Sequence, residues 1–405
     1  MPGPTRRHLS DLRGAARMAV DATAGVARIV ERMHRTIQLR PLPVGRAEPG
    51  NTRGITGLVY RSVHGGVRLV GQGIDLGLAP LVALLPEGES TPVRDAFVAA
   101  VNGVFGDYLV RTGNPLAIEM DLRYHDRPLD LENPSEAFGD GQDSRPSGRI
   151  LVMVHGLCLN DRHWLREGHD HGAALAADLR HTPLYVRYNT GLHIGDNGRD
   201  LAEMLETLVR NWPRPVDELV ILGHSMGGLV ARSAFHHARE AGHEWPSRLR
   251  RLFFLGTPHH GSPLERGGHR LDYVLEVSPY SAPFTRIGRM RSAGITDLRH
   301  GTITRGGHEH VPLPAGVRCY ALAATLGARR GLLGERLVGD GLVPLDSALG
   351  RHARSGHTLH FPKDRQWVGY GMGHLELMSR PEVYSQLHAW MKDETQGTPV
   401  SSRSR

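Results

Sequence analysis

Residues 219–232 read LVILGHSMGGLVAR, and this stretch decides the fold. Four apolar residues typical of a buried strand run into Gly-His-Ser-Met-Gly, and a helix-forming segment follows. A strand, a G-x-S-x-G pentapeptide and a helix in this order predict a nucleophile elbow, a turn so tight that its serine takes a strained backbone conformation. Side chains at Gly223 or Gly227 would collide with the neighbouring strand and helix, and Ser225 is the candidate nucleophile.

On both sides of this stretch, strand-like and helix-like segments alternate from Arg149 onward. Strands are expected at 150–154, 184–188, 219–222, 252–255, 317–323 and 357–361, and helices at 170–180, 197–211, after Ser225 and at 380–392. A short antiparallel pair is expected earlier, at 116–123 and 127–129. The alternation predicts the α/β class, with a mostly parallel, doubly wound sheet, right-handed crossovers and a site at the carboxyl ends of the strands.

A nucleophilic serine needs a base and an orienting carboxylate, which in this architecture follow it in the order serine, acid, histidine. Asp340 lies between glycines in VGDGLVP (338–344), a turn that can aim its side chain inward, with Asp346 and Asp364 as alternatives. His374 lies in GMGHLE (371–376), just before the last expected helix, with His360 as the alternative. We predict a catalytic triad of Ser225, Asp340 and His374.

An oxyanion hole is the remaining requirement of this chemistry. One donor is expected to be the backbone N–H of Met226, directly after the serine. The second is expected after the first core strand, in Val-His-Gly-Leu (154–157), where Gly156 lets the backbone turn and Leu157 N–H is the candidate donor. His155 is interpreted as a structural residue that supports this loop.

These motifs, together with LGTPHHGS (255–262), resemble those of the α/β-hydrolase superfamily, over about residues 149–392. The chain is similar to bacterial triacylglycerol lipases and to GPI inositol-deacylase-like serine esterases. The resemblance implies the α/β-hydrolase fold and the hydrolysis of a small-molecule or lipid ester, without a cofactor. No calcium-site pattern accompanies Asp340, so calcium dependence is not carried over. An acyltransferase on the same fold and a non-catalytic interaction protein remain as alternatives.

Two clusters rich in histidine raise the alternative of a metal site. Neither matches a known zinc spacing, and loop histidines usually face solvent, so we predict no metal. The residues concerned are Asp161, His163, His169, Asp170 and His171 in the first cluster, and His308, Glu309 and His310 in the second.

Charge and cysteine content limit the partners and the compartment. The 405-residue chain has a net charge of +7, but residues 1–40 hold eight arginines against three acidic residues, and Arg403 and Arg405 supply the rest. The predicted catalytic region is therefore neutral, which argues against a nucleic-acid partner. Two cysteines, no signal-peptide pattern and no apolar run of about 18 residues lead us to expect a cytoplasmic protein with reduced thiols.

The predicted domains are an N-terminal helical extension (1–115), a hydrolase domain (116–394) and a disordered tail (395–405). Apolar stripes at 9–37 and 59–85, followed by a helix at 91–111, form the extension. Its basic first helix either contacts an anionic membrane surface peripherally or docks on the hydrolase domain or on a second subunit. An insertion at about 261–315 is expected to cover the site as a lid or fixed cap, with Leu275 and Phe284 in the acyl-binding pocket.

Overall fold

The computed structural model describes residues 13–14, 17, 92–138, 146–261, 292–305, 310–327 and 339–393. By its internal contacts the chain divides into two units, Met1–Thr91 with Leu109–Ala117 and Pro92–Tyr108 with Ile118–Arg405. The predicted division into extension, hydrolase domain and tail stays a prediction, because most of the extension and the whole tail lie outside the described residues. None of the helices in the described ranges is long and apolar enough to cross a membrane.

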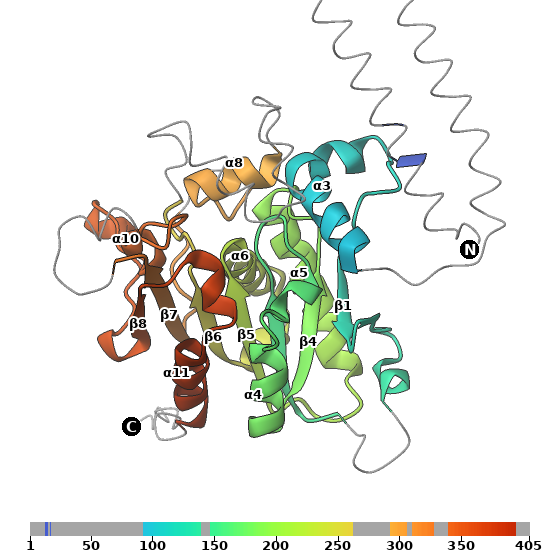
Figure 1. The fold of residues 1–405 in the computed structure, drawn as a ribbon. Coiled ribbons are helices and arrows are strands. Elements are labelled where there is room, and N and C mark those ends of the chain that lie inside the picture. The colour runs from blue at the N-terminus through green and yellow to red at the C-terminus, as the bar shows by residue number, and fades with distance from the viewer. Residues whose placement is uncertain are drawn as a thin grey trace, which may run out of the picture. The chain divides into compact units, whose positions relative to one another are not determined.

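An eight-stranded sheet runs through the second unit (Figure 1). Its spatial order is β2-β1-β4-β3-β5-β6-β7-β8, in which β1 is antiparallel to both of its neighbours and the remaining pairs are parallel. The strands are β1 (Asp121–Tyr124), β2 (Arg127–Pro128), β3 (Arg149–Val154), β4 (Thr182–Arg187), β5 (Glu218–His224), β6 (Leu249–Leu255), β7 (Arg318–Thr325) and β8 (Gln366–Tyr370).

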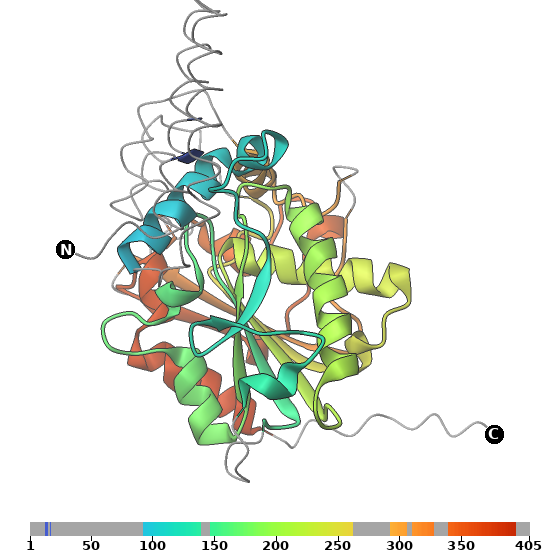
Figure 2. The same ribbon diagram turned by 90° about the vertical axis from the view of Figure 1, so that its right-hand side faces the viewer.

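Helices cover both faces of this sheet, as Figure 2 shows, with α4 and α11 on one side and α5 and α6 on the other. The α-helices are α3 (Pro92–Arg111), α4 (His171–Leu179), α5 (Ile194–Asn211), α6 (Met226–Ala241), α8 (Ala293–His300), α10 (Leu345–Ala348) and α11 (Pro381–Lys392). The 3-10 helices are η1 (Pro134–Ala137), η3 (Asp161–Trp164), η4 (Trp245–Ser247), η6 (Ser355–His357), η7 (Lys363–Arg365) and η8 (His374–Met378). The layers confirm the predicted fold class.

The core follows from the two-residue period of the strands. Side chains of a strand alternate between faces, so a strand covered on both sides must be apolar at every position, as Ile150 to Val154 are in β3. Leu151 and Leu222 on one face join a buried cluster that also contains Leu175 of α4 and Leu387 of α11. Each such leucine contributes about 1.5–3 kcal/mol by leaving water, so the sheet is a rigid base for the loops at its edge.

Two strand predictions need correction. The stretch 357–361 is not a strand, and the last strand is β8, at Gln366–Tyr370. The alternation of apolar and polar residues there reflects burial without sheet pairing, because Leu359 and Phe361 are buried while Leu359 N–H donates to the Gly350 carbonyl. Likewise β1 begins only at Asp121, since Ile118 N–H already donates to the Asn102 side chain instead of to a strand.

Candidate active site

The turn between β5 and α6 has the predicted elbow geometry. Ser225 lies between the two elements with φ 54° and ψ −124°, a conformation that residues other than glycine rarely adopt. A Cβ on Gly223 would lie 2.6 Å from the Cα of Gly228, and one on Gly227 would lie 2.2 Å from the Val154 carbonyl oxygen. Only glycines fit at these two positions. The tight turn between β5 and α6 therefore explains both the glycines of the sequence pattern and the strained backbone of Ser225.

Asp340 and His374 lie together at the same edge of the sheet, on the loops after β7 and β8. His374 Nδ1 is 2.6 Å from Asp340 Oδ2, and both side chains are almost fully buried. Asp340 Oδ1 accepts hydrogen bonds from the N–H groups of Leu342 (3.0 Å) and Val343 (2.8 Å). These contacts hold the carboxylate in one orientation, with its second oxygen directed at the imidazole.

The alternative acids and the alternative histidine are not part of the buried Asp340–His374 pair. Asp346 is half exposed and pairs with Arg351, and Asp364 belongs to the surface 3-10 helix η7. His360 is exposed. The structure therefore pairs the two residues that the sequence analysis preferred.

The main chain at Leu255 and Gly256 links Ser225 to the Asp340–His374 pair. Its N–H donates to the Leu255 carbonyl at 2.8 Å, and a Cβ on the next residue, Gly256, would lie 3.0 Å from His374 Cε1. The His374 ring is hydrogen-bonded to Asp340 through Nδ1. Catalytic hydrogen bonds in unliganded sites are often long, and contact between the serine hydroxyl and the imidazole belongs to the proposed reaction.

His224 is a contributor to the site that the sequence analysis missed. Its Nε2 donates to the His374 carbonyl at 3.2 Å, and its ring centroid lies 4.7 Å from that of His374. Burial and the neighbouring His374 hold the pKa of His224 well below its ordinary value, so the ring is neutral. The signal was present, because His224 is the second residue of the pentapeptide.

The two predicted oxyanion donors belong to segments next to Ser225. A Cβ on Gly156 would lie 3.0 Å from Ser225 Cβ, so the backbone leading to Leu157 passes directly beside the nucleophile. Met226 is the first residue of α6, where backbone N–H groups have no partner within the helix. Their role as oxyanion donors is part of the proposed reaction.

His155 has the structural surroundings that the sequence suggested. It is fully buried, its ring stacks on Tyr188 at 4.4 Å between centroids, and burial lowers its pKa to about 3. Like His224, it is therefore neutral over the pH range in which proteins are stable, and it adds no charge beside the candidate nucleophile.

The first histidine-rich cluster is occupied by internal contacts. Asp161 pairs with Arg123 and Arg187, while His169 is hydrogen-bonded to His171 at 2.9 Å. Among the described residues no group of three or more histidine, cysteine or carboxylate side chains is placed to hold a metal ion. In the second cluster, residues 308 and 309 lie outside the described ranges.

The predicted lid is described only in part. Leu275 and Phe284 lie outside the described residues. The described helix α8 lies over the edge of the sheet that carries the site (Figure 1), and Ser292 before it donates to the Gly103 carbonyl at 2.6 Å. Asp297 accepts from Ile194 N–H at 2.9 Å. This portion of the insertion is thus packed against α3 and the start of α5.

Both cysteines are free and buried, as expected. Burial raises the pKa of each thiol to about 12, so neither is a thiolate at neutral pH.

Strand order, elbow and acid–histidine pair together define the α/β-hydrolase fold, and the resemblance seen in the sequence is confirmed. Residues 190–315 match the PGAP1-like alpha/beta domain family. No curated protein sequence matches the chain.

Several solved structures are similar to this chain. The mature Bacillus licheniformis lipase BlEst2 is 19% identical, with a TM-score of 0.42, covering 67% of this chain and 96% of the lipase. The Pyrococcus furiosus esterase PF2001 is 16% identical, with a TM-score of 0.37, covering 61% and 82%. The metagenomic α/β-hydrolase MGS-MChE2 from the lagoon of Mar Chica is 16% identical, with a TM-score of 0.36, covering 62% and 94%. At such low TM-scores and identities, no residue role is carried over from these proteins to this chain.

Proposed function

We propose that the protein is a serine hydrolase that cleaves carboxylic esters, including lipid esters, through an acyl-enzyme intermediate. The observation that carries this proposal is the buried hydrogen bond of 2.6 Å between His374 Nδ1 and Asp340 Oδ2, beside a serine held at φ 54°. An acceptor at Nδ1 fixes the proton on that nitrogen and leaves Nε2 free to act as a base. The residues follow one another as serine, acid and histidine, the order expected on this fold.

The proposed reaction has two halves. In the first, Ser225 Oγ attacks the ester carbonyl carbon while His374 Nε2 takes the hydroxyl proton, and Asp340 stabilises the imidazolium that forms. The negative charge that develops on the carbonyl oxygen is received by the N–H groups of Leu157 and Met226. The imidazolium returns the proton to the leaving alcohol as the ester C–O bond breaks.

In the second half, water attacks the acyl group on Ser225, and the same imidazole takes the proton of the water and returns it to Ser225 Oγ. The products are a carboxylic acid, the free alcohol and the unchanged enzyme. No step requires a cofactor. Because only the second nucleophile distinguishes hydrolysis from acyl transfer, adding an alcohol acceptor in the assay also tests the acyltransferase alternative.

The test combines a covalent probe with a panel of substrates. A fluorophosphonate should label the wild-type protein at Ser225, and p-nitrophenyl esters of increasing chain length should be hydrolysed. Ser225→Ala should remove both labelling and turnover, with a loss of several orders of magnitude in rate.

Ser233→Ala is the matched control. Ser233 is buried in the same helix, α6, and its hydroxyl donates to the Ile303 carbonyl at 2.6 Å, away from the candidate site. This variant should keep its labelling and turnover. Turnover that survives in Ser225→Ala, or that is lost equally in both variants, would overturn the proposed function.

A further inference from the structure

The loop that carries the candidate oxyanion donor Leu157 is strained. Cys158, directly after it, has φ 59°, in the left-handed region that a residue with a side chain enters only when its surroundings enforce it. There is little space for the cysteine to relax, since a Cβ on Gly103 would lie 2.3 Å from Cys158 Sγ. Packing against α3 thus restrains the Cys158 side chain, and a hydrogen bond restrains its backbone.

Thr190 supplies that contact. Its Oγ1 accepts a hydrogen bond of 3.1 Å from Cys158 N–H, and both residues are buried. Thr190 lies just beyond the end of β4, the strand next to β3, so the bond joins the loops that follow two neighbouring strands. Because this N–H belongs to the peptide group between Leu157 and Cys158, the bond fixes the main chain immediately after the Leu157 amide.

The start of the same loop is held by Tyr188, from the same stretch of chain as Thr190. The Tyr188 hydroxyl donates to the His155 carbonyl at 2.7 Å, and the two rings stack. The loop is thus held on both sides of Leu157, before it by Tyr188 and after it by Thr190.

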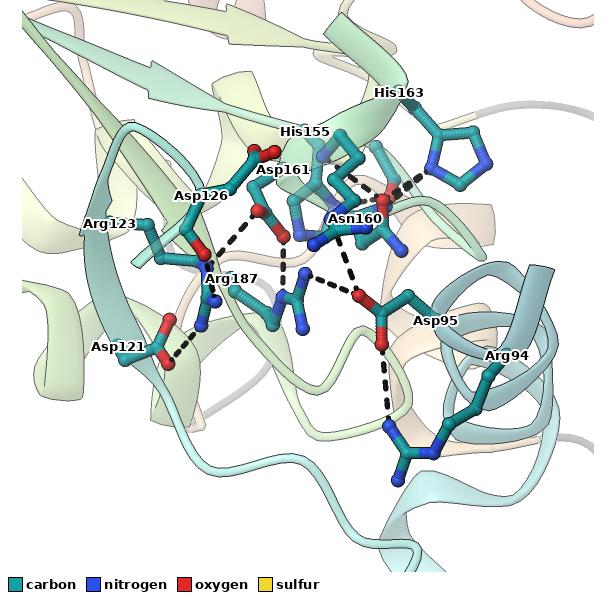
Figure 3. A network of polar contacts seen from close by, with 12 residues as sticks. Arg94, Asp95, Asp121, Arg123, Asp126, His155, Asn160, Asp161, His163 and Arg187 are labelled. Atoms are coloured by element: carbon teal, nitrogen blue, oxygen red, sulfur yellow. Dashed lines mark hydrogen bonds and ion pairs between the residues drawn. The ribbon is translucent and has the colours of Figure 1, made fainter. Parts of the chain in front are cut away.

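The end of the loop is held by a network of charges, shown in Figure 3. Arg187, at the end of β4, pairs with Asp161, the first residue of η3, and, at 3.1 Å, with Asp95 of α3. Arg123 of β1 lies 3.2 Å from the second oxygen of Asp161. Both carboxylates are almost fully buried, so the network fixes the chain at Asp161, three residues after Cys158.

We propose that Thr190 is a positioning residue for the oxyanion hole. Through Cys158 N–H it keeps the Leu157 N–H directed at the oxygen of the reacting carbonyl. This inference rests on the proposed ester hydrolysis, since an oxyanion hole has a role only if a tetrahedral intermediate forms. The Thr190 hydroxyl acts through the Cys158 N–H, so its effect is transmitted by one backbone amide.

The test compares two threonines of matched environment. Thr190→Val keeps the shape of the side chain and removes the acceptor, and Thr190→Ser restores it. Thr182→Val is the control, because Thr182 Oγ1 accepts the same type of bond, from Ser147 N–H at 2.8 Å, at the opposite end of β4. Each valine variant removes one hydrogen bond from a backbone N–H to a buried threonine, with the N–H buried at Cys158 and partly buried at Ser147, so the loss of thermal stability should be similar or somewhat smaller in Thr182→Val.

The expected result is a fall in kcat of about 10- to 100-fold in Thr190→Val with KM unchanged, less than the loss of about 10²- to 10³-fold that follows removal of a whole oxyanion donor. Affinity for a trifluoromethyl ketone, which forms a tetrahedral adduct with the serine, should fall in proportion to kcat. Thr190→Ser should recover most of the rate, and Thr182→Val should keep it.

Equal kcat values in Thr190→Val and Thr182→Val would overturn the inference while leaving ester hydrolysis standing. A rise in KM at unchanged kcat would overturn it as well, since that pattern marks lost ground-state binding. A wild-type protein with neither fluorophosphonate labelling nor ester turnover would instead overturn the proposed function, and with it this inference.

Discussion

Asp340→Asn is the substitution whose effect the structure defines best. The two carboxylate oxygens have different neighbours, because Oδ1 accepts from the N–H groups of Leu342 and Val343 while Oδ2 faces His374 Nδ1. In the variant, the amide oxygen must take the position of Oδ1, since an NH₂ group there would face two donors. The NH₂ group then points at Nδ1 and donates to it, so the imidazole proton moves to Nε2.

A proton on Nε2 removes the base that the serine needs. The same exchange of acid for amide in a serine protease triad lowers kcat by about 10⁴, and we expect a loss of that size, about 5–6 kcal/mol in the barrier. Stability should change much less, by about 1 kcal/mol, because all three hydrogen bonds of the side chain are kept.

The measurements are kcat on a p-nitrophenyl ester at pH 7 and urea unfolding of the same preparations. Asp346→Asn is the control, since its half-exposed carboxylate pairs with Arg351 and not with a candidate site residue within the described part of the chain, and it should keep the wild-type rate. A loss below tenfold in Asp340→Asn would refute the tautomer reasoning. A larger loss in Asp346→Asn would show that the wrong acid was assigned.

Three further predictions concern stability, substrate range and membranes. Although burial raises the pKa of Glu218, hydrogen bonding to His181 and the neighbouring arginine charges lower it to about 2. Glu218→Gln should therefore cost up to about 3 kcal/mol in urea unfolding at pH 7, and this difference should shrink as the pH falls from about 4.5 towards 2; the same difference at pH 7 and pH 3 would contradict the linkage. Replacing Leu275 and Phe284 by alanine should alter the preference for acyl-chain length more than turnover of acetate esters, and an equal loss on both would indicate a packing role. In flotation with phosphatidylserine vesicles at low salt, the full chain should bind better than a variant with the arginines of residues 1–40 changed to glutamine, because each basic side chain near the surface contributes about 1 kcal/mol; equal binding, or none by either, would exclude recruitment through these charges.

Much of the fold could be predicted from the sequence because its signals are local. The buried strand before Ser225, the glycines of the elbow and the amphipathic pattern of α5 each act over a few residues, so the parallel α/β sheet could be read from them. The pattern failed at 357–361, where burial and polar alternation imitate a strand. Whether such a segment forms hydrogen bonds with a sheet depends on which sheet edge lies next to it, and that is set by the tertiary structure.

The candidate site divides in the same way. Ser225 could be named as the candidate nucleophile from local sequence, because the collisions that require Gly223 and Gly227 arise within one turn and leave a recognisable pattern around it. The sequence also reduced the acid to three aspartates.

The choice of Asp340 among those three depends on the tertiary structure, which places it against a histidine 34 residues further along the chain. The hydrogen bond from Cys158 N–H to Thr190 is also visible only in the structure, because the sequence around a threonine does not indicate which N–H will donate to its hydroxyl. Contacts between distant residues depend on strand order and loop path, which arise from packing of the whole sheet and are not encoded by any short segment.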